Sequence, residues 1–323
     1  MKKFLKHTHF LVTGGAGFIG SNLVEELLKN NYRVTVLDNL STGKIENIKP
    51  FMNNSNFKFI KGDIRNLDVC LKACENIDYL LHQAAIGSVS RSLEEPILYN
   101  DININGTLNI MYAAQNKKVK KVVYASSSSV YGDTETLPKI EGNEGQLLSP
   151  YSLTKKVDEM YALMFYKIYK LPTIGLRYFN VYGPKQNEKS IYSAVIPSFI
   201  NKLINNEQVT INGDGESSRD FTYVSDVVKA NINACLASSK CNGKIYNIAY
   251  GDQTTLNDLY YNIRALLKKE LKPIYGPFRK GDIRHSKADI SKAKKELDYR
   301  PTTNISLGLE KTVNWYLQNQ IKP

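Results

Sequence analysis

The amino-terminal half of the chain alternates between short runs rich in β-branched residues and longer stretches with helical periodicity. The short runs read HFLVTG, RVTVLD, FKFIKGD, YLLHQAA and KVVYASSS. After the first run, apolar residues recur at the spacing of one helix face: Phe18, Ile19, Leu23, Val24, Leu27 and Leu28. This alternation predicts an α/β fold in which a parallel sheet is covered by helices on both faces.

Beyond residue 180 the pattern loosens. Loop-rich segments separate the helical pieces there: NVYGPKQNEKS, INGDGESSRDF and YGPFRKGDIRHS. No repeat at solenoid spacing and no long linker interrupts the chain. We expect this second half to cover the open edge of the sheet and to supply contacts to a substrate.

The composition is that of a globular protein with room for about two packed units, since the chain has 323 residues, 42% hydrophobic and 23% charged. No apolar run reaches the roughly 20 residues that span a bilayer. The start, MKKFLKHTHFLVTGG, is broken by His7 and His9 and leads into a glycine turn rather than a cleavage site. We therefore expect a mature cytoplasmic protein with no membrane partner.

The formal net charge of +12 does not by itself indicate a nucleic-acid partner. The lysines are scattered, and the one short basic block, NKKVKK, is not interleaved with aromatic residues. We expect a solvated basic surface that helps to attract a polyanionic small substrate.

The four cysteines, Cys70, Cys74, Cys235 and Cys241, match no zinc spacing and form no disulfide framework. Buried or inert thiols and no metal are expected.

The segment LVTGGAGFIGSNL joins a strand end, a glycine turn and a helix start. Gly14, Gly17 and Gly20 have the spacing that lets the backbone approach a pyrophosphate at the positive end of a helix. The next strand ends in Asp38, near the expected position of an acid that binds an adenosine ribose. A carboxylate there would repel a 2′-phosphate, so the predicted cofactor is NAD rather than NADP. The alternative is a tight turn without a ligand.

The segment LSPYSLTKK places a phenol and an ammonium one helical turn apart. Ser149 can cap a helix and Pro150 can take its first position, which puts Tyr151 and Lys155 on one face. An ordinary phenol, with a pKa of about 10, is a poor base near neutral pH. A neighbouring ammonium and the positive nicotinamide ring favour the phenolate form. The alternative is a surface pair with the tyrosine in the core.

Together these motifs resemble the extended short-chain dehydrogenase/reductase superfamily over nearly the whole chain. The following segments stand in the order shown by NAD-dependent nucleotide-sugar epimerases: TGGAGFIG, LDNLSTG, KGDIRN, LLHQAA, YASSSSVYGD, SPYSLTK, LRYFNVYGP, RDFTYVSDVV and KGDIRHSKADISKA. We accordingly expect a Rossmann-type doubly wound parallel sheet with a smaller mixed α/β substrate-binding domain. The NAD-binding domain is predicted at residues 1–180, with a return segment near 221–249, and the substrate-binding domain at 181–220 and 250–323.

The resemblance implies catalytic roles for Tyr151 and Lys155. It also implies a hydroxyl four residues before the tyrosine of the VYG element, which is Ser127, with Ser128 next because four serines in a row blur the register. The implied cofactor contacts are Gly14, Gly17, Phe18, Ile19, Gly20, Asp38, Asn39, Asp63, Ile64, Gln83, Ala84, Ala85, Tyr151, Lys155 and Tyr178. The implied substrate contacts are Ser88, Ser127, Ser128, Tyr151, Asn180, Arg219, Arg279 and Ser286. The two arginines suit a diphosphate or a uridine ribose, because a guanidinium can donate two parallel bonds.

The serine run also bears on the reaction. Relatives that dehydrate the sugar carry Thr-Asp-Glu where this chain has Ser127, Ser128 and Ser129, and relatives that decarboxylate UDP-glucuronate typically carry a glutamate at the third position. No carboxyl group stands here, so the resemblance favours a UDP-sugar 4-epimerase acting through a transient 4-keto sugar with tightly held NAD. A non-catalytic dinucleotide-binding module is the alternative of another class.

The expected substrate follows from one small residue. In UDP-galactose 4-epimerases, a position seven residues after the arginine of an R-x-G-D element often gates the pocket. Counting from Arg279 gives Ser286, which leaves room for an N-acetyl group. The chain therefore looks most like bacterial enzymes that interconvert UDP-N-acetylglucosamine and UDP-N-acetylgalactosamine for surface polysaccharides. UDP-glucose/UDP-galactose and UDP-uronate epimerases are the alternatives.

Two helices carry more apolar residues than one sheet contact requires: YALMFYKIY and DININGTLNIMYAAQ. Family members commonly pair such helices into a four-helix bundle, so a homodimer is expected. The alternative is that both stripes belong to the core.

Overall fold

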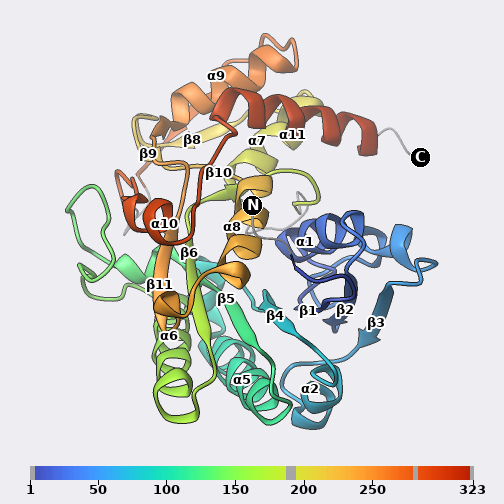
Figure 1. Cartoon of the computed structure of the whole chain (residues 1–323). Coiled ribbons are helices and arrows are strands. Elements are labelled where there is room, and N and C mark those ends of the chain that lie inside the picture. The colour runs from blue at the N-terminus through green and yellow to red at the C-terminus, as the bar shows by residue number, and fades with distance from the viewer. Residues whose placement is uncertain (1–3, 187–193, 279–282, 321–323) are drawn as a thin grey trace.

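A seven-stranded parallel sheet forms the centre of the molecule (Figure 1). The computed structural model describes residues 4–186, 194–278 and 283–320. The strands of the sheet are β1 (His9–Thr13), β2 (Arg33–Asp38), β3 (Phe57–Lys61), β4 (Tyr79–His82), β5 (Lys121–Ser127), β6 (Thr173–Tyr178) and β11 (Lys244–Ile248). Their order, β11-β6-β5-β4-β1-β2-β3, reverses direction between β1 and β4. Each of the five predicted apolar runs forms one of the first five strands.

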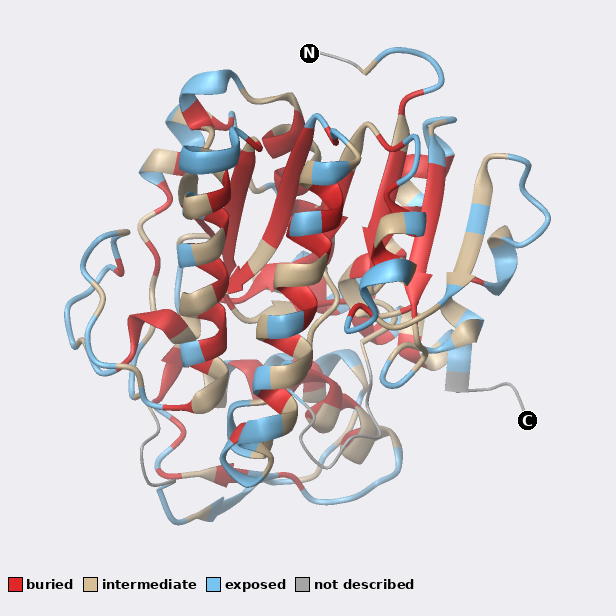
Figure 2. Ribbon diagram, turned by 90° about the horizontal axis from the view of Figure 1, so that it is seen from below, coloured by how far each residue is buried: buried red, intermediate tan, exposed pale blue. Residues whose placement is uncertain are grey.

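Helices cover both faces of the sheet, which confirms the doubly wound prediction. On one face a core joins the sheet to α1 (Phe18–Lys29), α8 (Val224–Leu236) and α10 (Ser291–Glu296). On the other face a second core joins it to α2 (Leu67–Ala73), α5 (Gly106–Asn116) and α6 (Pro150–Tyr169). The central strands are buried almost throughout, whereas α5 and α6 each show an exposed face (Figure 2). Strands buried on both faces need near-continuous apolar runs, as the sequence has.

Short helices connect these layers. They are η1 (Ile45–Asn47), η2 (Lys49–Phe51), α3 (Val89–Glu94), α4 (Pro96–Tyr99), the π-helix η3 (Asn100–Asn105), η4 (Ser128–Tyr131) and η5 (Ser239–Cys241).

A second, smaller unit lies beyond one end of the sheet (Figure 1). Its helices are α7 (Val195–Ile204), α9 (Leu256–Leu266) and α11 (Ile305–Gln320). Its short strands pair as β7 (Val181–Tyr182) with β10 (Thr222–Tyr223), β8 (Thr210–Asn212) with β13 (Ile274–Gly276), and β9 (Ser218–Arg219) with β12 (Thr254–Thr255). The three helices, β8 and the β7–β10 pair pack into a third core, which Val224 at the start of α8 and Phe18 of α1 also contact.

The chain returns from the smaller unit to the sheet twice. Residues 221–249 supply α8 and the edge strand β11, within the predicted return segment. A later stretch, inside the range predicted for the substrate-binding domain, packs Ala293, Leu297 and Tyr299 into the first core. The sequence pattern predicted only helical pieces between loops in this half, and such a pattern does not show which surface a helix covers.

The four cysteines are buried free thiols, as predicted. Burial raises the pKa of Cys70, Cys74 and Cys235 to about 12, so these thiols are unreactive near neutral pH. Among the described helices, none has the length and apolar character that crossing a membrane requires.

Candidate active site

A cavity of about 800 Å³ opens at the carboxyl ends of the parallel strands. Gly14 follows β1, Asp38 ends β2, Gln83 follows β4, Ser127 ends β5 and Tyr178 ends β6, and all five line the cavity. Carboxyl ends of parallel strands meet at one edge of a sheet, and the reversal of strand order leaves a crevice there. The fold therefore brings together residues that lie far apart in the sequence.

Every described residue that the sequence indicated as a site residue lines this cavity. The set comprises Gly14, Gly17, Phe18, Ile19, Gly20, Asp38, Asn39, Asp63, Ile64, Gln83, Ala84, Ala85, Ser88, Ser127, Ser128, Tyr151, Lys155, Tyr178, Asn180, Arg219 and Ser286. Arg279 lies outside the described residues.

The glycine turn packs too closely for side chains. Gly14 has φ +67°, and a Cβ on it would lie 2.8 Å from the backbone of Ala84. A Cβ on Gly20 would lie 2.1 Å from the Gly14 carbonyl oxygen. Gly17 is the N-cap residue of α1 and offers no side-chain cap, which leaves the helix start to the cavity. This arrangement fits the pyrophosphate of a dinucleotide at the positive helix end.

Asp38 is held at the cavity wall by two backbone groups. Its Oδ2 accepts a hydrogen bond from the Ala16 nitrogen at 2.9 Å, and its Oδ1 accepts one from the Leu40 nitrogen at 2.8 Å. Burial raises the pKa of Asp38, and the two backbone donors oppose that shift. The oxygens retain lone pairs for further donors, so the carboxylate fits the hydroxyls of an adenosine ribose.

A second carboxylate on the cavity wall, Asp63, is fixed by its neighbours. Asn39 Nδ2 donates to Asp63 Oδ2 at 2.8 Å, and the Arg65 guanidinium donates to both oxygens. Hydrogen bonding to Arg65 lowers the pKa of Asp63 to about 2. Asp63 is therefore a rigid, charged group beside Asn39.

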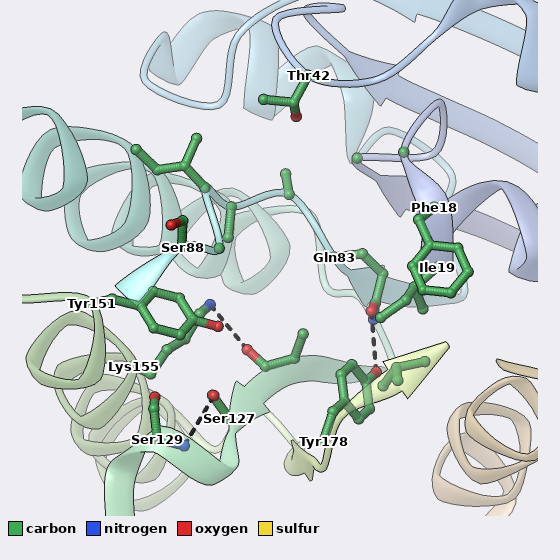
Figure 3. Close-up of a pocket in the computed structure, with 18 of the residues that line it drawn as sticks. Phe18, Ile19, Thr42, Gln83, Ser88, Ser127, Ser129, Tyr151, Lys155 and Tyr178 are labelled. Carbon is green, nitrogen blue, oxygen red and sulfur yellow. Dashed lines mark hydrogen bonds between the residues drawn. The ribbon is translucent and has the colours of Figure 1, made fainter. Parts of the chain in front are cut away.

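The start of α6 confirms the interpretation of the LSPYSLTKK segment. The Ser149 hydroxyl accepts a hydrogen bond from the Ser152 nitrogen at 3.1 Å, the reciprocal bond also forms, and Pro150 takes the first helical position. Tyr151 consequently lies in the first turn, with Lys155 one turn later. Both side chains point into the cavity on the side where Ser127 lies (Figure 3).

The Lys155 ammonium is almost fully buried, with 4% of its side chain exposed. Its Nζ donates to the Ala125 carbonyl oxygen at 3.1 Å and to Asp158 Oδ2 at 3.1 Å. The Tyr151 ring meets the buried Tyr99 ring edge-on, with the centroids 6.2 Å apart. Packing thus fixes the phenol as firmly as hydrogen bonds fix the ammonium.

The serine run divides into distinct roles. Ser126 Oγ donates its proton to Glu159 Oε1 at 2.6 Å, so this hydroxyl has no proton left to donate to a ligand. Ser127 Oγ accepts from the Ser129 nitrogen at 3.1 Å and keeps its own proton for another acceptor. Ser128 is the first residue of η4, and both Ser128 and Ser129 line the cavity.

Two buried oxygens on the cavity wall, Ser129 Oγ and Gln186 Oε1, have no hydrogen-bond partner among the described residues. Buried polar atoms are nearly always bonded, so these two are available to a ligand. The sequence interpretation missed Gln186, and it considered Ser129 only for the carboxyl group that it lacks.

The predicted substrate contacts are anchored by the backbone around them. Ser88 caps α3, its Oγ accepting from the Arg91 nitrogen at 3.2 Å. Asn180 Nδ2 donates to the Asp220 carbonyl oxygen at 3.1 Å, and Arg219 Nη1 donates to the Ser218 carbonyl oxygen at 3.0 Å.

Ser286 lies on a strand-like segment whose backbone nitrogen donates to the Ser218 carbonyl oxygen at 3.1 Å. The smaller unit therefore brings Arg219 and Ser286 to the same wall of the cavity.

Tyr178 is a neutral part of the wall. Its hydroxyl accepts a hydrogen bond from Asn231 Nδ2 at 2.8 Å and lies 3.1 Å from both Gln83 Oε1 and Asn231 Oδ1, one of which can accept its proton. Burial raises the pKa of Tyr178 far above the ordinary value. Tyr178 therefore cannot serve as the base near neutral pH.

The cavity has lining residues that the sequence interpretation did not name. Those with chemically informative side chains or positions are Ser41, Thr42, Lys44, Asn47, Gly87, Tyr99, Lys139, Lys185, Gln186 and Ala194. Ser41, Thr42, Lys44 and Asn47 lie three to nine residues after Asp38, the predicted ribose contact, and that proximity in sequence could have identified them.

Comparison with known proteins gives consistent results. The family model described as "NAD dependent epimerase/dehydratase family" matches residues 10–249. The chain is 35% identical over 308 residues to the UDP-glucose 4-epimerase of Mycolicibacterium smegmatis, covering 95% of this chain and 97% of that protein.

Two solved structures have nearly the same fold. One is the UDP-N-acetylglucosamine 4-epimerase from Methanobrevibacter ruminantium M1 in complex with UDP-N-acetylmuramic acid, with a TM-score of 0.92, 40% identity and coverage of 98% of this chain and 100% of that chain. The other is the UDP-glucuronic acid 4-epimerase from Bacillus cereus in complex with UDP-glucuronic acid and NAD, with a TM-score of 0.89, 34% identity and coverage of 97% and 100%.

The geometry of Asp38 leads to a prediction about cofactor choice. In Asp38→Ser, the affinity for NAD should fall at least about tenfold, because a hydrogen bond to a charged group contributes about 1.5–3 kcal/mol. The affinity for NADP relative to NAD should rise, because the repelling charge is gone. Calorimetric titration of the apoprotein with each dinucleotide measures both effects.

Asp68→Ser, in the exposed first turn of α2, is the matched control and should leave both affinities unchanged. The predicted ribose-binding role would be contradicted if the ratio of the affinity for NAD to the affinity for NADP were the same in Asp38→Ser as in the wild type.

Proposed function

This chain belongs to the NAD dependent epimerase/dehydratase family, and from that premise we propose that it interconverts UDP-N-acetylglucosamine and UDP-N-acetylgalactosamine by epimerisation at sugar carbon 4. Its cofactor is NAD, as predicted. The observation that carries the proposal is the placement of Tyr151 and Lys155 beside Ser127, in the same cavity as the glycine turn.

Each residue of the proposed mechanism has a task that its position in the cavity and its contacts support. Bound NAD supplies the reversible oxidation of sugar carbon 4. Tyr151, as the phenolate, accepts the proton of the 4-hydroxyl and returns a proton once the 4-keto sugar has presented its other face. Lys155 favours the phenolate through its charge. Ser127 donates its free proton to the sugar oxygen, because its own oxygen already accepts from Ser129.

The positions of the carboxyl groups on the cavity wall argue against dehydration of the sugar as the main reaction. Among the described lining residues, the carboxyl groups are those of Asp38 and Asp63. Both belong to the proposed NAD contacts, and elimination of water from the sugar needs an added acid and base beside the serine run. Epimerisation needs neither.

The proposed N-acetylated substrate rests on the lining of the cavity. Ser286, Ala194 and Gly87 are small, and the lining oxygens of Gln186 and Ser129 have no partner among the described residues. The lining therefore includes both small side chains and free hydrogen-bonding groups that suit an acetamido group. UDP-glucose and UDP-glucuronate, the substrates of the enzymes named above, are the alternatives.

We assign a different ligand to each of the two units. We propose that residues 1–180 with 221–249 bind NAD, and that 181–220 with 250–323 bind the UDP sugar. The third core supports this division, because it packs α7, α9 and α11 of the smaller unit together apart from the two cores on the sheet. Phe221, Tyr223 and Val224 join it where the return segment begins.

We further propose that the chain forms a homodimer through α4, α5 and α6. Large apolar side chains remain exposed on these helices, at Ile97, Tyr112, Leu153, Met160 and Leu163. Contiguous exposed apolar surface of this kind is typical of a protein interface.

The assignment of the base predicts the behaviour of Tyr151→Phe. Epimerisation should fall by a factor of about 10²–10⁴, because the phenyl ring cannot accept the proton. Binding of NAD should persist. Product analysis by chromatography after incubation with UDP-N-acetylglucosamine gives the rate. Tyr169→Phe, at the exposed end of the same helix, is the control, and full activity in Tyr151→Phe would exclude Tyr151 as the base.

The pocket wall predicts substrate choice. The wild type should convert UDP-N-acetylglucosamine more efficiently than UDP-glucose, and Ser286→Tyr should reverse that order by filling the space for the acetamido group. Values of kcat/KM over a panel of UDP-N-acetylglucosamine, UDP-glucose and UDP-glucuronate measure the preference. A wild type that acts on UDP-glucose or UDP-glucuronate alone would refute the N-acetyl proposal and support the corresponding alternative.

The exposed helix faces predict the oligomeric state. Light scattering should give the mass of a dimer for the wild type and that of a monomer for the double variant Leu153→Glu with Met160→Glu. Ile274→Glu, on the exposed strand β13, is the control and should remain dimeric. A monomeric wild type at micromolar concentration would exclude the dimer.

A further inference from the structure

The buried carboxylate of Asp158 lies directly behind the catalytic pair and has no part in the mechanism above. Asp158 follows Lys155 by three residues on α6, and only 1% of its side chain is exposed. Its Oδ2 accepts the hydrogen bond from Lys155 Nζ at 3.1 Å. The Ala125 carbonyl oxygen accepts a second bond from the same ammonium. A negative group therefore neutralises part of the charge that should favour the phenolate of Tyr151.

The other charged groups near Asp158 on α6 and the adjoining strands are paired with one another. Glu159, the next residue, accepts from Arg177 of β6 at 2.8 Å through each of its oxygens. Lys156 lies 3.4 Å from Glu144 and 3.6 Å from Glu159. Arg177 also pairs with Glu144, which is on the loop before α6. These pairs leave Lys155 as the cation that faces Asp158 in the described part of the chain.

A buried phenol on β5 adds no positive charge. Burial raises the pKa of Tyr124 well above its ordinary value, and the carboxylates of Glu159 and Asp158 raise it further. Tyr124 is therefore neutral.

The groups on α5 and β4 are neutral as well. The Thr107 hydroxyl of α5 lies near enough to Asp158 to stabilise its charged form. The same hydroxyl is 3.0 Å from His82 Nε2, and His82 Nδ1 is 2.7 Å from Thr13 Oγ1. Burial, and then the charge of Lys155, lower the pKa of His82 to about 3. No second cation therefore competes with Lys155 from this side among the described groups.

Asp158 itself is under-paired for a buried carboxylate. Its Oδ1 accepts no hydrogen bond from the described residues. Burial raises its pKa to about 6, although Lys155 and Thr107 act in the opposite direction. The group is thus charged at neutral pH and becomes neutral as the pH falls below that value.

We propose that Asp158 is a positioning residue that offsets the charge of Lys155 and so sets the pH above which Tyr151 is a phenolate. The inference rests on the proposed function for the task of Tyr151. Electrostatics gives the direction in which the pH of phenolate formation should move when Asp158 is neutralised. A neutral residue at position 158 leaves the full positive charge of Lys155 beside the phenol, so the phenolate forms at lower pH.

Asp158→Asn tests the inference with two measurements on the holoenzyme. The first is a phenolate absorbance titration from which the titration of Tyr151→Phe is subtracted. The second is the pH profile of kcat/KM for UDP-N-acetylglucosamine, whose acidic limb reports the essential base. Both midpoints should move to lower pH by up to about one pH unit, the low end of the effect of a directly neighbouring charge, because Asp158 acts on Tyr151 through Lys155. Asp158→Glu retains the charge and should bring both midpoints back toward the wild type.

Asp226→Asn is the matched control for loss of a buried carboxylate. Asp226 lies on α8, where its carboxylate accepts from the nitrogens of Thr302 and Thr303, and this variant should leave both midpoints unchanged. Where Asp158→Asn does not fold, as judged by circular dichroism, Asp158→Ser serves as the second neutral variant.

Unmoved midpoints in Asp158→Asn, with only a lower kcat, would show that Asp158 is merely structural and overturn the inference. A shift to higher pH would overturn it as well. The absorbance titration needs no sugar, so it decides the matter even if the wild type converts none of the UDP sugars. Failure of the proposed function appears separately, in the wild-type assay.

Discussion

The whole site depends on one constraint: the carboxyl ends of seven parallel strands meet at a single edge of the sheet. Strand order reverses between β1 and β4, so the segments after β1, β4 and β5 diverge and leave a crevice between them. The cavity of about 800 Å³ lies in that crevice. The turns and strand ends along one side of the cavity are held in place by the two sheet cores, and the smaller unit supplies Ala194, Arg219 and Ser286 to the lining.

Buried charge is the second organising feature, and it is concentrated beneath the serine run. The Arg177 guanidinium, with 2% of its side chain exposed, is bonded to Glu159 and Glu144, and Glu159 also accepts from Ser126. Buried ions of this kind are tolerated only when they are paired and hydrogen-bonded. The network fixes the strand that carries Ser127 to the helix that carries Tyr151, and so links the two sides of the proposed chemistry.

Sequence patterns located much of the site because most of its residues adjoin strand ends or a helix start. Gly14, Asp38 and Tyr151 could be placed in this way, since a turn, a strand end and a capping signal are local features. Gln186 and Asp158 could not. Gln186 lies in the loop after β7, where its Nε2 donates to the Val181 carbonyl oxygen, and no local pattern marks such a loop residue as part of the cavity lining. Asp158 has the sequence pattern of an ordinary polar helix residue, and only its burial against Lys155 distinguishes it.

The sequence by itself determined the strands and helices of the first half, the parallel sheet, the glycine turn after the first strand and the helical spacing of Tyr151 and Lys155, because each of these depends on residues close together in the chain. Only the tertiary structure decided which surfaces the second half covers, that residues 288–299 return to the sheet core, and that the Lys155 ammonium is shared with Asp158. Such features depend on burial and on contacts between distant segments, and local periodicity carries no information about either.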